Sequence, residues 1–410
     1  MNILHICDWY HPIGGAEKLL FDTLNSLEAR GHTNIVVYNK HEGNGTSGGS
    51  RPEYACAGLE YFHYFPPGVQ MLARQPIEPI RQIIAQHQPD VCHIHNFQNL
   101  YVTEFLIHTI PCARSIHDPR LYCFTNWKLL PDKTICDRPF GKACIEEGCI
   151  SKGLFARTDF DRNAPYILRN YTLHKKMPAL IAESRAQIDT LVDSGFDPEQ
   201  IEWLPNFTPI LPRNEVERFK AEQYRDDAIP IVLFVGRASY EKGPQVLLEA
   251  CRYIRSKCRV VLITAGPALK DLQVQASQFP DLVEVIGGLP YAETKKWYAR
   301  AACVVVPSVW LENFCLVGLE AYANMTPVIG SDIGGIKDWL RDDETGCLAD
   351  PANPRDLAEK IDLALSSPDK LRNMGRNGYA RVCKYYNQEL YLDRLLAIYA
   401  KTVRKHWSRL

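Results

Sequence analysis

Short apolar runs alternate with amphipathic segments along most of the chain. The run Asn2–Cys7 predicts a buried strand, a turn containing Gly14 and Gly15 follows, and Ala16–Arg30 repeats leucine at helical spacing. Asn34–Tyr38 predicts the next strand. Strand, glycine-containing turn, helix and strand in this order are typical of the start of a doubly wound parallel sheet. Two further strands are expected at 91–95 and 112–116.

A second series of strands and helices begins near Pro230. Ile231–Val235 predicts a buried strand that ends at Gly236. The other expected elements are a helix at 244–256, a strand at 259–264, a helix at 292–302, a strand at 303–306, a helix at 316–323 and a strand at 327–329. Between the two series, 206–227 holds two prolines and then a charged stretch, as a connection would.

The expected fold class is therefore α/β, with two Rossmann-like doubly wound domains facing a central cleft. The domains are expected at 1–205 and 206–385, and a last helix at 386–410 is expected to pack back across them. The length of 410 residues fits this division, because a single core stops growing near about 250–300 residues.

Composition and charge exclude several classes of protein. Hydrophobic residues make up 46% and charged residues 23%, which excludes a disordered chain, a collagen and a coiled coil. The formal net charge of −1 argues against a nucleic-acid partner, because such binding needs a basic surface. The first residues lack the basic flank and apolar stretch of a signal peptide, and no apolar run is long enough to span a membrane. We therefore expect a cytoplasmic protein with reduced thiols.

Two cations mark a candidate anion site after the strand that starts the second series. Arg237 and Lys242 lie five residues apart, and Gly243 and Pro244 then begin the expected helix. The free N–H groups and dipole of a helix N-terminus, together with two cations, favour phosphate. The alternative is a pair of exposed loop cations.

Two carboxylates mark a second candidate site. Glu312 lies in the turn after the expected strand at 303–306, and Glu320 lies on the following helix, roughly 10–12 Å along its axis at 1.5 Å per residue. Carboxylates so placed can accept hydrogen bonds from different hydroxyl pairs of one extended ligand. The alternative is that Glu312 caps the helix and Glu320 is solvated.

Three motifs together resemble a known family. GGAEK near the start, G-R-x4-K-G at 236–243, and E-x7-E at 312–320 followed by TPVI and GGI are similar to the retaining GT-B glycosyltransferases of glycosyltransferase family 4, also called glycosyl transferases group 1. The resemblance covers nearly the whole chain and is strongest over 230–365. It implies transfer of a sugar from a nucleotide-diphosphate donor to an acceptor hydroxyl with retention, in bacterial surface glycan or glycoconjugate synthesis, without a cofactor.

The resemblance also implies residue roles. Arg237 and Lys242 would hold the donor diphosphate and stabilise it as it leaves, which would be the main catalytic contribution. Glu312 would contact the transferred sugar, and Glu320 would bind the ribose hydroxyls. His117 would lie beside the sugar ring as a catalytic residue, although a histidine next to an aspartate is also a common structural pair. Further donor-site positions would be Gly14, Gly15, Leu289, Asn313 and Phe314. The family often has glycine where this chain has Cys315, which puts the local phosphate-binding geometry in question.

The segment after His117 is rich in cysteine. Successive members of the set Cys123, Cys136, Cys144 and Cys149 are separated by 12, 7 and 4 residues. Four thiols in a loop-rich stretch that cannot build its own core predict a structural zinc site. An iron–sulfur cluster, disulfides and free thiols remain alternatives. His93 and His95 also have metal-like spacing, but residues at alternate positions of a strand share one face, and a structural role is favoured.

The acceptor side is expected in the N-terminal half. A glycan or a lipid-linked acceptor is implied, and the mixed aromatic and basic segments 61–81 and 168–177 raise peripheral contact with the inner membrane face as an alternative to a solvated helix face.

Three rival functions remain. A metal-dependent GT-A-like transferase would use the Asp159-Phe160-Asp161 motif. The others are a nucleotide-sugar epimerase of the same fold, which product analysis would distinguish, and a non-catalytic nucleotide-sugar or glycan-binding module.

Overall fold

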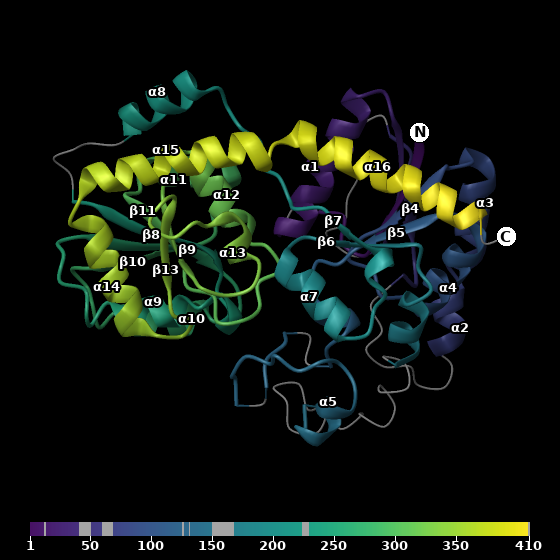
Figure 1. The fold of residues 1–410 in the computed structure, drawn as a ribbon, viewed down its shortest axis with the longest axis horizontal. Helices are drawn as coiled ribbons and strands as arrows, with labels where there is room; N and C mark the ends of the chain where they lie inside the picture. The colour runs from purple at the N-terminus through teal and green to yellow at the C-terminus, as the bar shows by residue number, and fades with distance from the viewer. Residues whose placement is uncertain are drawn as a thin grey trace. The chain divides into compact units, whose positions relative to one another are not determined.

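The computed structural model describes residues 1–11, 14–40, 51–59, 69–124, 127–130, 132–149, 168–223 and 229–408. The chain forms two compact units (Figure 1). Unit 1 comprises Met1–Pro205 together with Tyr391–Leu410, and unit 2 comprises Asn206–Leu390.

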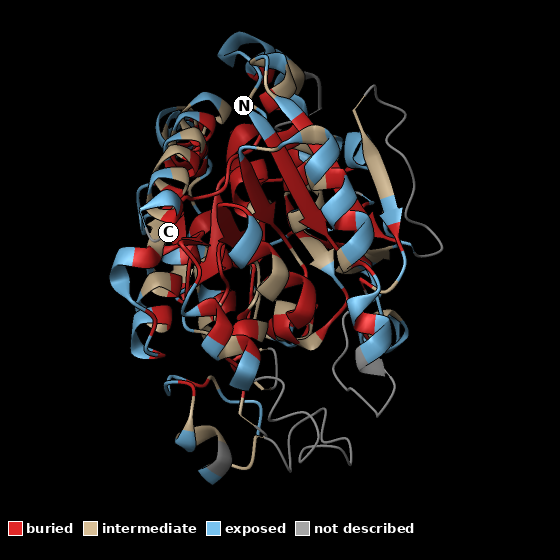
Figure 2. Cartoon of the chain, turned by 90° about the vertical axis from the view of Figure 1, so that its right-hand side faces the viewer, coloured by how far each residue is buried: buried red, intermediate tan, exposed pale blue. Residues whose placement is uncertain are grey.

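Unit 1 is built on a seven-stranded parallel sheet in the order β3-β2-β1-β4-β5-β6-β7. Its strands are β1 (Asn2–Cys7), β2 (Thr33–Asn39), β3 (Glu53–Cys56), β4 (Val91–Ile94), β5 (Cys112–Ser115), β6 (Ala179–Ala182) and β7 (Ile201–Trp203). Its helices are α1 (Gly15–Ala29), α2 (Val69–Arg74), α3 (Ile77–His87), α4 (Leu100–Thr109), η1 (Pro119–Leu121), α5 (Lys142–Glu146), α7 (Arg185–Asp193), η2 (Pro198–Gln200) and most of α16 (Gln388–Trp407). The central strands are buried, and the helices around them expose one side (Figure 2), as expected when helices cover a parallel sheet.

Unit 2 is built on a six-stranded parallel sheet in the order β10-β9-β8-β11-β12-β13. Its strands are β8 (Ile231–Arg237), β9 (Arg259–Ala265), β10 (Val283–Ile286), β11 (Cys303–Val306), β12 (Val328–Ser331) and β13 (Gly346–Ala349). Its helices are α8 (Arg213–Gln223), η3 (Tyr240–Lys242), α9 (Pro244–Ala250), α10 (Leu269–Ala276), α11 (Tyr291–Arg300), α12 (Leu316–Ala323), α13 (Ile336–Trp339), α14 (Pro354–Leu365) and α15 (Pro368–Tyr385).

The two parallel Rossmann-like sheets confirm the predicted fold class. The predicted bounds of β1, β11 and α12 are confirmed, whereas the helix expected at 244–256 is six residues too long. The structure ends α9 at Ala250, and the backbone N–H groups of Arg255 and Ser256 donate to the carboxylate of Asp362 on α14. This partner lies more than a hundred residues away, so the local pattern could not reveal where the helix ends.

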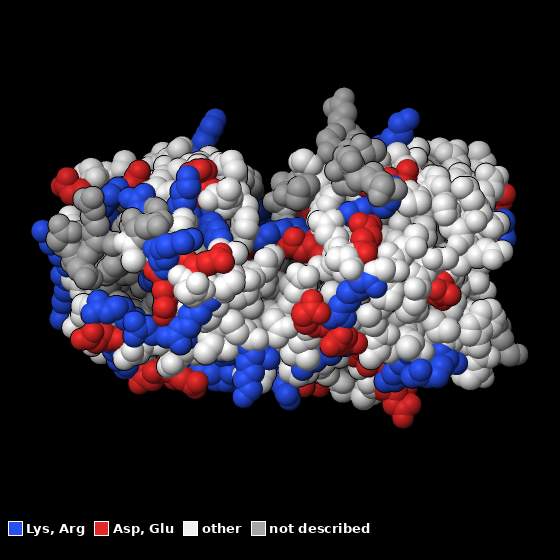
Figure 3. Space-filling view, turned by 90° about the horizontal axis from the view of Figure 1, so that it is seen from above, with Lys and Arg blue, Asp and Glu red and all other residues white. Residues whose placement is uncertain are grey.

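The predicted connection at 206–227 also contains more structure than expected. Residues 213–223 form α8, and Val216 packs with Met325 and Tyr379 in a small apolar cluster. No helix among the described residues is long and apolar enough to cross a bilayer. Acidic and basic side chains are interspersed on the face drawn in Figure 3.

Candidate functional site

Each sheet has one topological switch point, where the strand order reverses. In unit 1 it lies between β1 and β4, and in unit 2 between β8 and β11. Open α/β sheets bind ligands in the crevice outside the carboxyl ends of the strands at such a point. Arg237 ends β8, Lys242 ends the short η3 helix that follows, and Glu312 lies in the loop after β11. The charged residues predicted to bind the donor therefore flank the switch point of unit 2.

Gly243 fixes the turn that presents Lys242. Its φ is +73°, in the left-handed region, and a Cβ there would lie 1.8 Å from the carbonyl oxygen of Pro307. The absence of a side chain lets the turn between η3 and α9 pack directly on the loop after β11. Pro244, with its preset φ, then begins α9.

Gly243→Ala is expected to lower the free energy of unfolding by about 2–4 kcal/mol, because it adds both backbone strain and a backbone clash. Gly287→Ala is the matched control, since a Cβ at Gly287 would meet nothing within 4 Å, and its effect should stay within about 0.5 kcal/mol. Urea denaturation of the two variants measures the difference. Equal stability of the two would contradict the assigned packing.

A buried ion pair joins the two strand ends. Lys242 Nζ lies 2.8 Å from Glu312 Oε1, the Ser308 hydroxyl donates to the same oxygen at 2.7 Å, and the Glu312 side chain is 3% exposed. Burial disfavours both charges, but their attraction outweighs it, so the pKa of Glu312 is lowered and that of Lys242 is raised. Lys242 Nζ also lies 5.1 Å from the centre of the Trp310 ring. An ammonium group has three N–H donors, so the hydrogen bond to Glu312 leaves Lys242 able to donate to a ligand as well.

Arg237 is positioned by its own loop. Its Nη2 donates to Glu241 Oε1 at 2.6 Å and its Nε donates to Ser239 Oγ at 3.2 Å, and the Ser239 hydroxyl in turn donates to Glu241. The Glu241 carboxylate is buried, whereas the Arg237 side chain is half exposed. The guanidinium is therefore oriented from one side, and its other side faces outward.

Glu320 is buried, so its alternative interpretation as a solvated helix residue is wrong. Its Oε2 accepts a hydrogen bond from the Tyr298 hydroxyl of α11 at 2.9 Å. Burial and the Glu320 carboxylate raise the pKa of Tyr298, which therefore stays a hydroxyl donor. Burial raises the pKa of Cys315, and the negative charge of Glu312 raises it further, so this thiol stays protonated.

The start of α12 keeps the conformation that glycine would provide. Cys315 is the N-cap with φ of +73°, and the Phe314 carbonyl accepts a hydrogen bond from Trp339 Nε1 at 2.6 Å. The neighbouring Asn313 is buried, and its Nδ2 has no hydrogen-bond partner within the described ranges. Leu289 lies half-buried in the loop between β10 and α11. Asn313 thus holds a donor that a bound ligand would satisfy.

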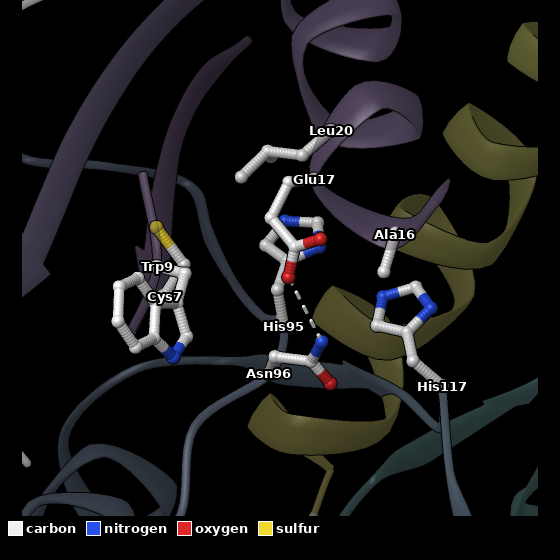
Figure 4. A pocket seen from close by; sticks show the side chains of 8 residues that line it. All are labelled: Cys7, Trp9, Ala16, Glu17, Leu20, His95, Asn96 and His117. Carbon is white, nitrogen blue, oxygen red and sulfur yellow. Dashed lines mark hydrogen bonds between the residues drawn. The ribbon is translucent and has the colours of Figure 1, made fainter. Parts of the chain in front are cut away.

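A small pocket lies at the switch point of unit 1 (Figure 4). It is lined by Cys7, Trp9, Ala16, Glu17, Leu20, His95, Asn96 and His117. Its cavity volume of about 10 Å³ is room for about one water molecule, so it holds at most one group of a larger ligand.

His117 has one paired and one unpaired ring nitrogen. Its Nδ1 lies 2.6 Å from Glu183 Oε1, and the two side chains are 6% and 8% exposed. Its Nε2 is buried and has no partner among the residues that the structure describes. Burial alone would lower the pKa of His117, but the hydrogen bond and charge of Glu183 outweigh it, so the pKa is raised. The ring can therefore donate from Nε2 into the pocket near neutral pH.

A carboxylate lies beside the glycine-containing turn. Gly14 has an ordinary extended φ of −124°, and a Cβ there would lie 2.5 Å from Glu17 Oε2. Asn96 Nδ2 donates to Glu17 Oε1 at 3.4 Å, as Figure 4 shows. Gly15 is the first residue of α1. The negative charge of Glu17 favours ligand hydroxyl groups here over phosphate.

His5, His93 and His95 bring three ligand atoms within 4.8 Å of one another. Hydrogen bonds already engage both nitrogens of two rings: His5 contacts His95 and Asn34, and His93 contacts Tyr399 and Ser115. Burial lowers the pKa of all three, that of His5 to about 3, so the rings are neutral. This network supports the structural interpretation of His93 and His95.

Several site residues escaped the sequence interpretation. They are Glu17, Asn96, Glu183, Tyr298 and Ser308. Glu17 lies within the GGAEK motif and Ser308 lies four residues before Glu312, so proximity to a motif was a usable signal for these two. No local pattern links Glu183 to His117 or Tyr298 to Glu320, because folding alone brings each pair together.

Parts of the predicted acceptor side fall outside the described residues. They are residues 61–68, the first eight of the segment 61–81. The motif 159–161 of the rival GT-A interpretation also lies outside the described residues. Of the basic side chains nearby, Arg74 and Arg169 both stack on the Tyr101 ring, with 4.6 and 5.5 Å to its centre.

Two family models match the chain. The model described as Glycosyltransferase Family 4 matches residues 13–210, and the model described as Glycosyl transferases group 1 matches residues 215–381. With two Rossmann-like units, each carrying its polar residues at a switch point, the protein has the GT-B architecture. The chain belongs to the glycosyltransferases of family 4, group 1.

Individual curated relatives match only part of the chain and at low sequence identity. A D-inositol 3-phosphate glycosyltransferase of Segniliparus rotundus is 32% identical over 248 residues, which are 55% of this chain and 54% of the relative. The chain thus spans about half the length of the curated relatives it matches.

Solved structures match over nearly the full length. A sucrose-phosphate synthase from Thermosynechococcus elongatus aligns over 98% of both chains with a TM-score of 0.75 and 20% identity. Anabaena HepE, solved in complex with UDP-glucose, aligns over 100% of both chains with a TM-score of 0.68 and 17% identity. At these identities the structures show the shared fold.

Proposed function

We propose that this protein transfers a glycosyl group from a nucleoside-diphosphate sugar to an acceptor hydroxyl, with retention of the anomeric configuration. The observation that carries the proposal is the set of oriented cations, Arg237 and Lys242, at the switch point of unit 2 beside the carboxylates Glu312 and Glu320. A diphosphate needs such cations, and a ribose or sugar needs such carboxylates.

The donor is assigned part by part. Arg237 and Lys242 contact the diphosphate, and the unpaired Nδ2 of Asn313 donates to the same ligand. Glu320, held by Tyr298, accepts hydrogen bonds from the ribose hydroxyls. Glu312 contacts the transferred sugar, and backbone groups near Leu289 meet the base. Uridine is the first base to test, because HepE, with the same fold, was solved with UDP-glucose.

The reaction breaks the bond between the anomeric carbon and the donor phosphate oxygen, and forms one between that carbon and the acceptor oxygen. The acceptor proton passes to an oxygen of the leaving diphosphate, so the acceptor attacks on the face of the sugar from which the diphosphate departs, and the anomeric configuration is retained. Arg237 and Lys242 stabilise the negative charge that grows on the diphosphate. His117 donates from Nε2 to a hydroxyl of a bound saccharide.

The acceptor is proposed to be a saccharide hydroxyl of a bacterial surface glycan or glycoconjugate. The pocket of unit 1 offers the Glu17 carboxylate, the Asn96 amide and His117, which pair with hydroxyl groups. The curated relatives are bacterial and bear glycosyltransferase names.

Nucleotide binding tests the donor site. At a free ligand concentration of about 100 Kd, the matching nucleoside diphosphate should stabilise the protein by about 2.7 kcal/mol, seen as a raised Tm. Among UDP, GDP and ADP we expect one clear preference, lost in Glu320→Gln and kept in Glu293→Gln, whose carboxylate is half exposed and pairs with Lys296. Release of the nucleoside diphosphate from the matching sugar donor then tests transfer. A panel in which no nucleotide or nucleotide sugar raises the Tm would contradict the assignment.

A further inference from the structure

The cysteine segment, defined as residues 123–149, has little regular structure of its own. Among its described residues, the regular elements are the antiparallel bridge between Leu129 and Ile135 and the five-residue α5. A stretch with so little regular structure gains from an additional constraint that lowers the entropy of its unfolded chain. None of the 14 cysteines is part of a disulfide, so disulfides do not supply that constraint.

The backbone of Lys128 ties the first two cysteines of the segment together. Its N–H donates to Cys123 Sγ at 3.3 Å, and its carbonyl accepts a hydrogen bond from the Cys136 N–H at 2.8 Å. Lys128 has a φ of +51°, which is uncommon for a residue with a side chain and turns its N–H toward the sulfur. Hydrogen bonds from backbone N–H groups to cysteine sulfur stabilise the thiolate form that binds metals.

The second pair of cysteines lies in the same segment. Burial raises the pKa of Cys144, which lies within α5, and negative charge at Cys123 and Cys136 raises it further; Cys149 is affected in the same way by the other three cysteines. Among the described residues no three of these sulfur atoms lie within 4.8 Å of one another, so the segment carries four nearby thiols without a finished site.

The ammonium group of Lys128 adds a positive charge to this segment. Lys128 is buried, its Nζ donates to the carbonyl of Arg138, and its charge acts on Cys144. The Lys128 side chain therefore links the turn after Cys123 to the residues that follow Cys136.

We propose that Cys123, Cys136, Cys144 and Cys149 bind one structural Zn²⁺ ion. Four thiolates at about 2.3 Å from the ion complete the closed tetrahedral shell of structural zinc sites. Binding releases the thiol protons and involves no change of oxidation state, so no further reactant is needed. Among the described residues only the three histidines bring their ligand atoms within 4.8 Å of one another, so the ion must draw the sulfur atoms together, to about 3.8 Å in a tetrahedral site.

The zinc site would order the chain next to the pocket of unit 1. The segment begins shortly after His117, and Asp118 caps the intervening η1 helix through the Arg120 N–H. The apolar side of the segment already contacts the core of unit 1, where Phe140 stacks on Phe124 and packs against Tyr171. The ion would fix the polar side. The inference stands whether or not the proposed function is correct, since metal content is measured apart from activity.

Metal analysis of the full-length protein, purified without added metal, tests the proposal. We expect about one equivalent of zinc, lost in Cys136→Ser and in Cys144→Ser. Cys258→Ser is the matched control, because Cys258 is equally buried but belongs to unit 2, and it should keep its zinc. Less than about a tenth of an equivalent in the wild-type protein overturns the proposal, as does zinc that survives both serine substitutions. Stoichiometric iron with acid-labile sulfide would overturn it in favour of a cluster.

A second measurement uses the wild-type protein, so it tests the proposal even if the cysteine variants fail to fold. Wild-type protein is stripped with a chelator and refilled with Co²⁺ alone, and sulfur-to-cobalt charge-transfer absorption is expected. Trypsin should cut the stripped protein within residues 123–149 at least about tenfold faster than the zinc-loaded protein. The reason is that binding of structural zinc supplies folding free energy, so its removal exposes the segment. Cobalt spectra without thiolate bands, or zinc lost from His95→Ala and kept in Cys136→Ser, would place the ion at the histidines and overturn the assignment.

Discussion

Lys242→Ala is expected to lower the rate of glycosyl transfer by about 10²–10³-fold, the usual loss when one donor to a developing negative charge is removed. The ammonium lies 2.8 Å from the buried Glu312 carboxylate, in the turn that follows β8. The substitution removes one of the two positive charges proposed to contact the leaving diphosphate. Measuring kcat/KM for the matched nucleotide sugar gives the loss directly.

The same substitution leaves the Glu312 charge without its cation, which typically costs about 3–5 kcal/mol of stability. Loss of activity by unfolding is separated from loss of catalysis by the double variant Lys242→Ala/Glu312→Gln. Removing both charges should restore most of the stability, whereas transfer should stay low. Lys296→Ala is the control, because its half-exposed ammonium pairs with Glu293 on the surface of α11. Near-normal transfer by the stable double variant would remove Lys242 and Glu312 from the proposed mechanism.

Glu183→Gln is expected to move the alkaline limb of the pH–rate profile toward lower pH. The Glu183 carboxylate, 2.6 Å from His117 Nδ1, outweighs burial and holds the pKa of His117 above its ordinary value of 6.5. Without that charge, burial dominates and lowers the pKa, so the donating imidazolium is lost at lower pH. At pH 7.5 the variant should lose about tenfold or more in kcat, while His117→Ala should lose about 10²–10⁴-fold at pH values below the alkaline limb of the wild type.

The same pair predicts a pH dependence of stability. A histidine whose folded pKa is raised contributes stability that is fully present below its unfolded pKa of about 6.5 and is lost as the pH rises through the folded value. The Tm difference between the wild type and Glu183→Gln should therefore shrink as the pH rises above 6.5. If both the rate profile and this Tm difference are unchanged by the substitution, Glu183 does not position or charge His117.

The sequence predicted more of the proposed donor site than of the proposed acceptor side. Arg237, Lys242, Glu312 and Glu320 were identified by spacing, because each follows a buried strand or lies on the helix after it. Spacing could not show that Glu312 pairs with Lys242, or that Tyr298 holds Glu320, since these contacts join different elements. From its spacing, Glu312 was expected to accept hydrogen bonds from ligand hydroxyl groups. The structure shows that Lys242 already pairs with its carboxylate.

The N-terminal half illustrates the limit more clearly. The GGAEK motif drew attention to Gly14, but the structure gives this glycine an ordinary extended φ and places the Glu17 carboxylate beside it. Cys315 shows the reverse case. It departs from the glycine expected at that position, yet its backbone adopts the glycine-like φ of +73°, because the packing around the start of α12 imposes it.

The sequence by itself determined the two parallel sheets and the order of strands and helices along the chain. Local hydrophobic periodicity shows which segments are buried strands and which are helices with one buried face. Only the tertiary structure decided which polar groups meet. His117 meets Glu183, and Lys242 meets Glu312, across 66 and 70 residues of chain. Such pairs depend on which strands are neighbours in the sheet, and strand order is set by the packing of the whole unit rather than by any local segment.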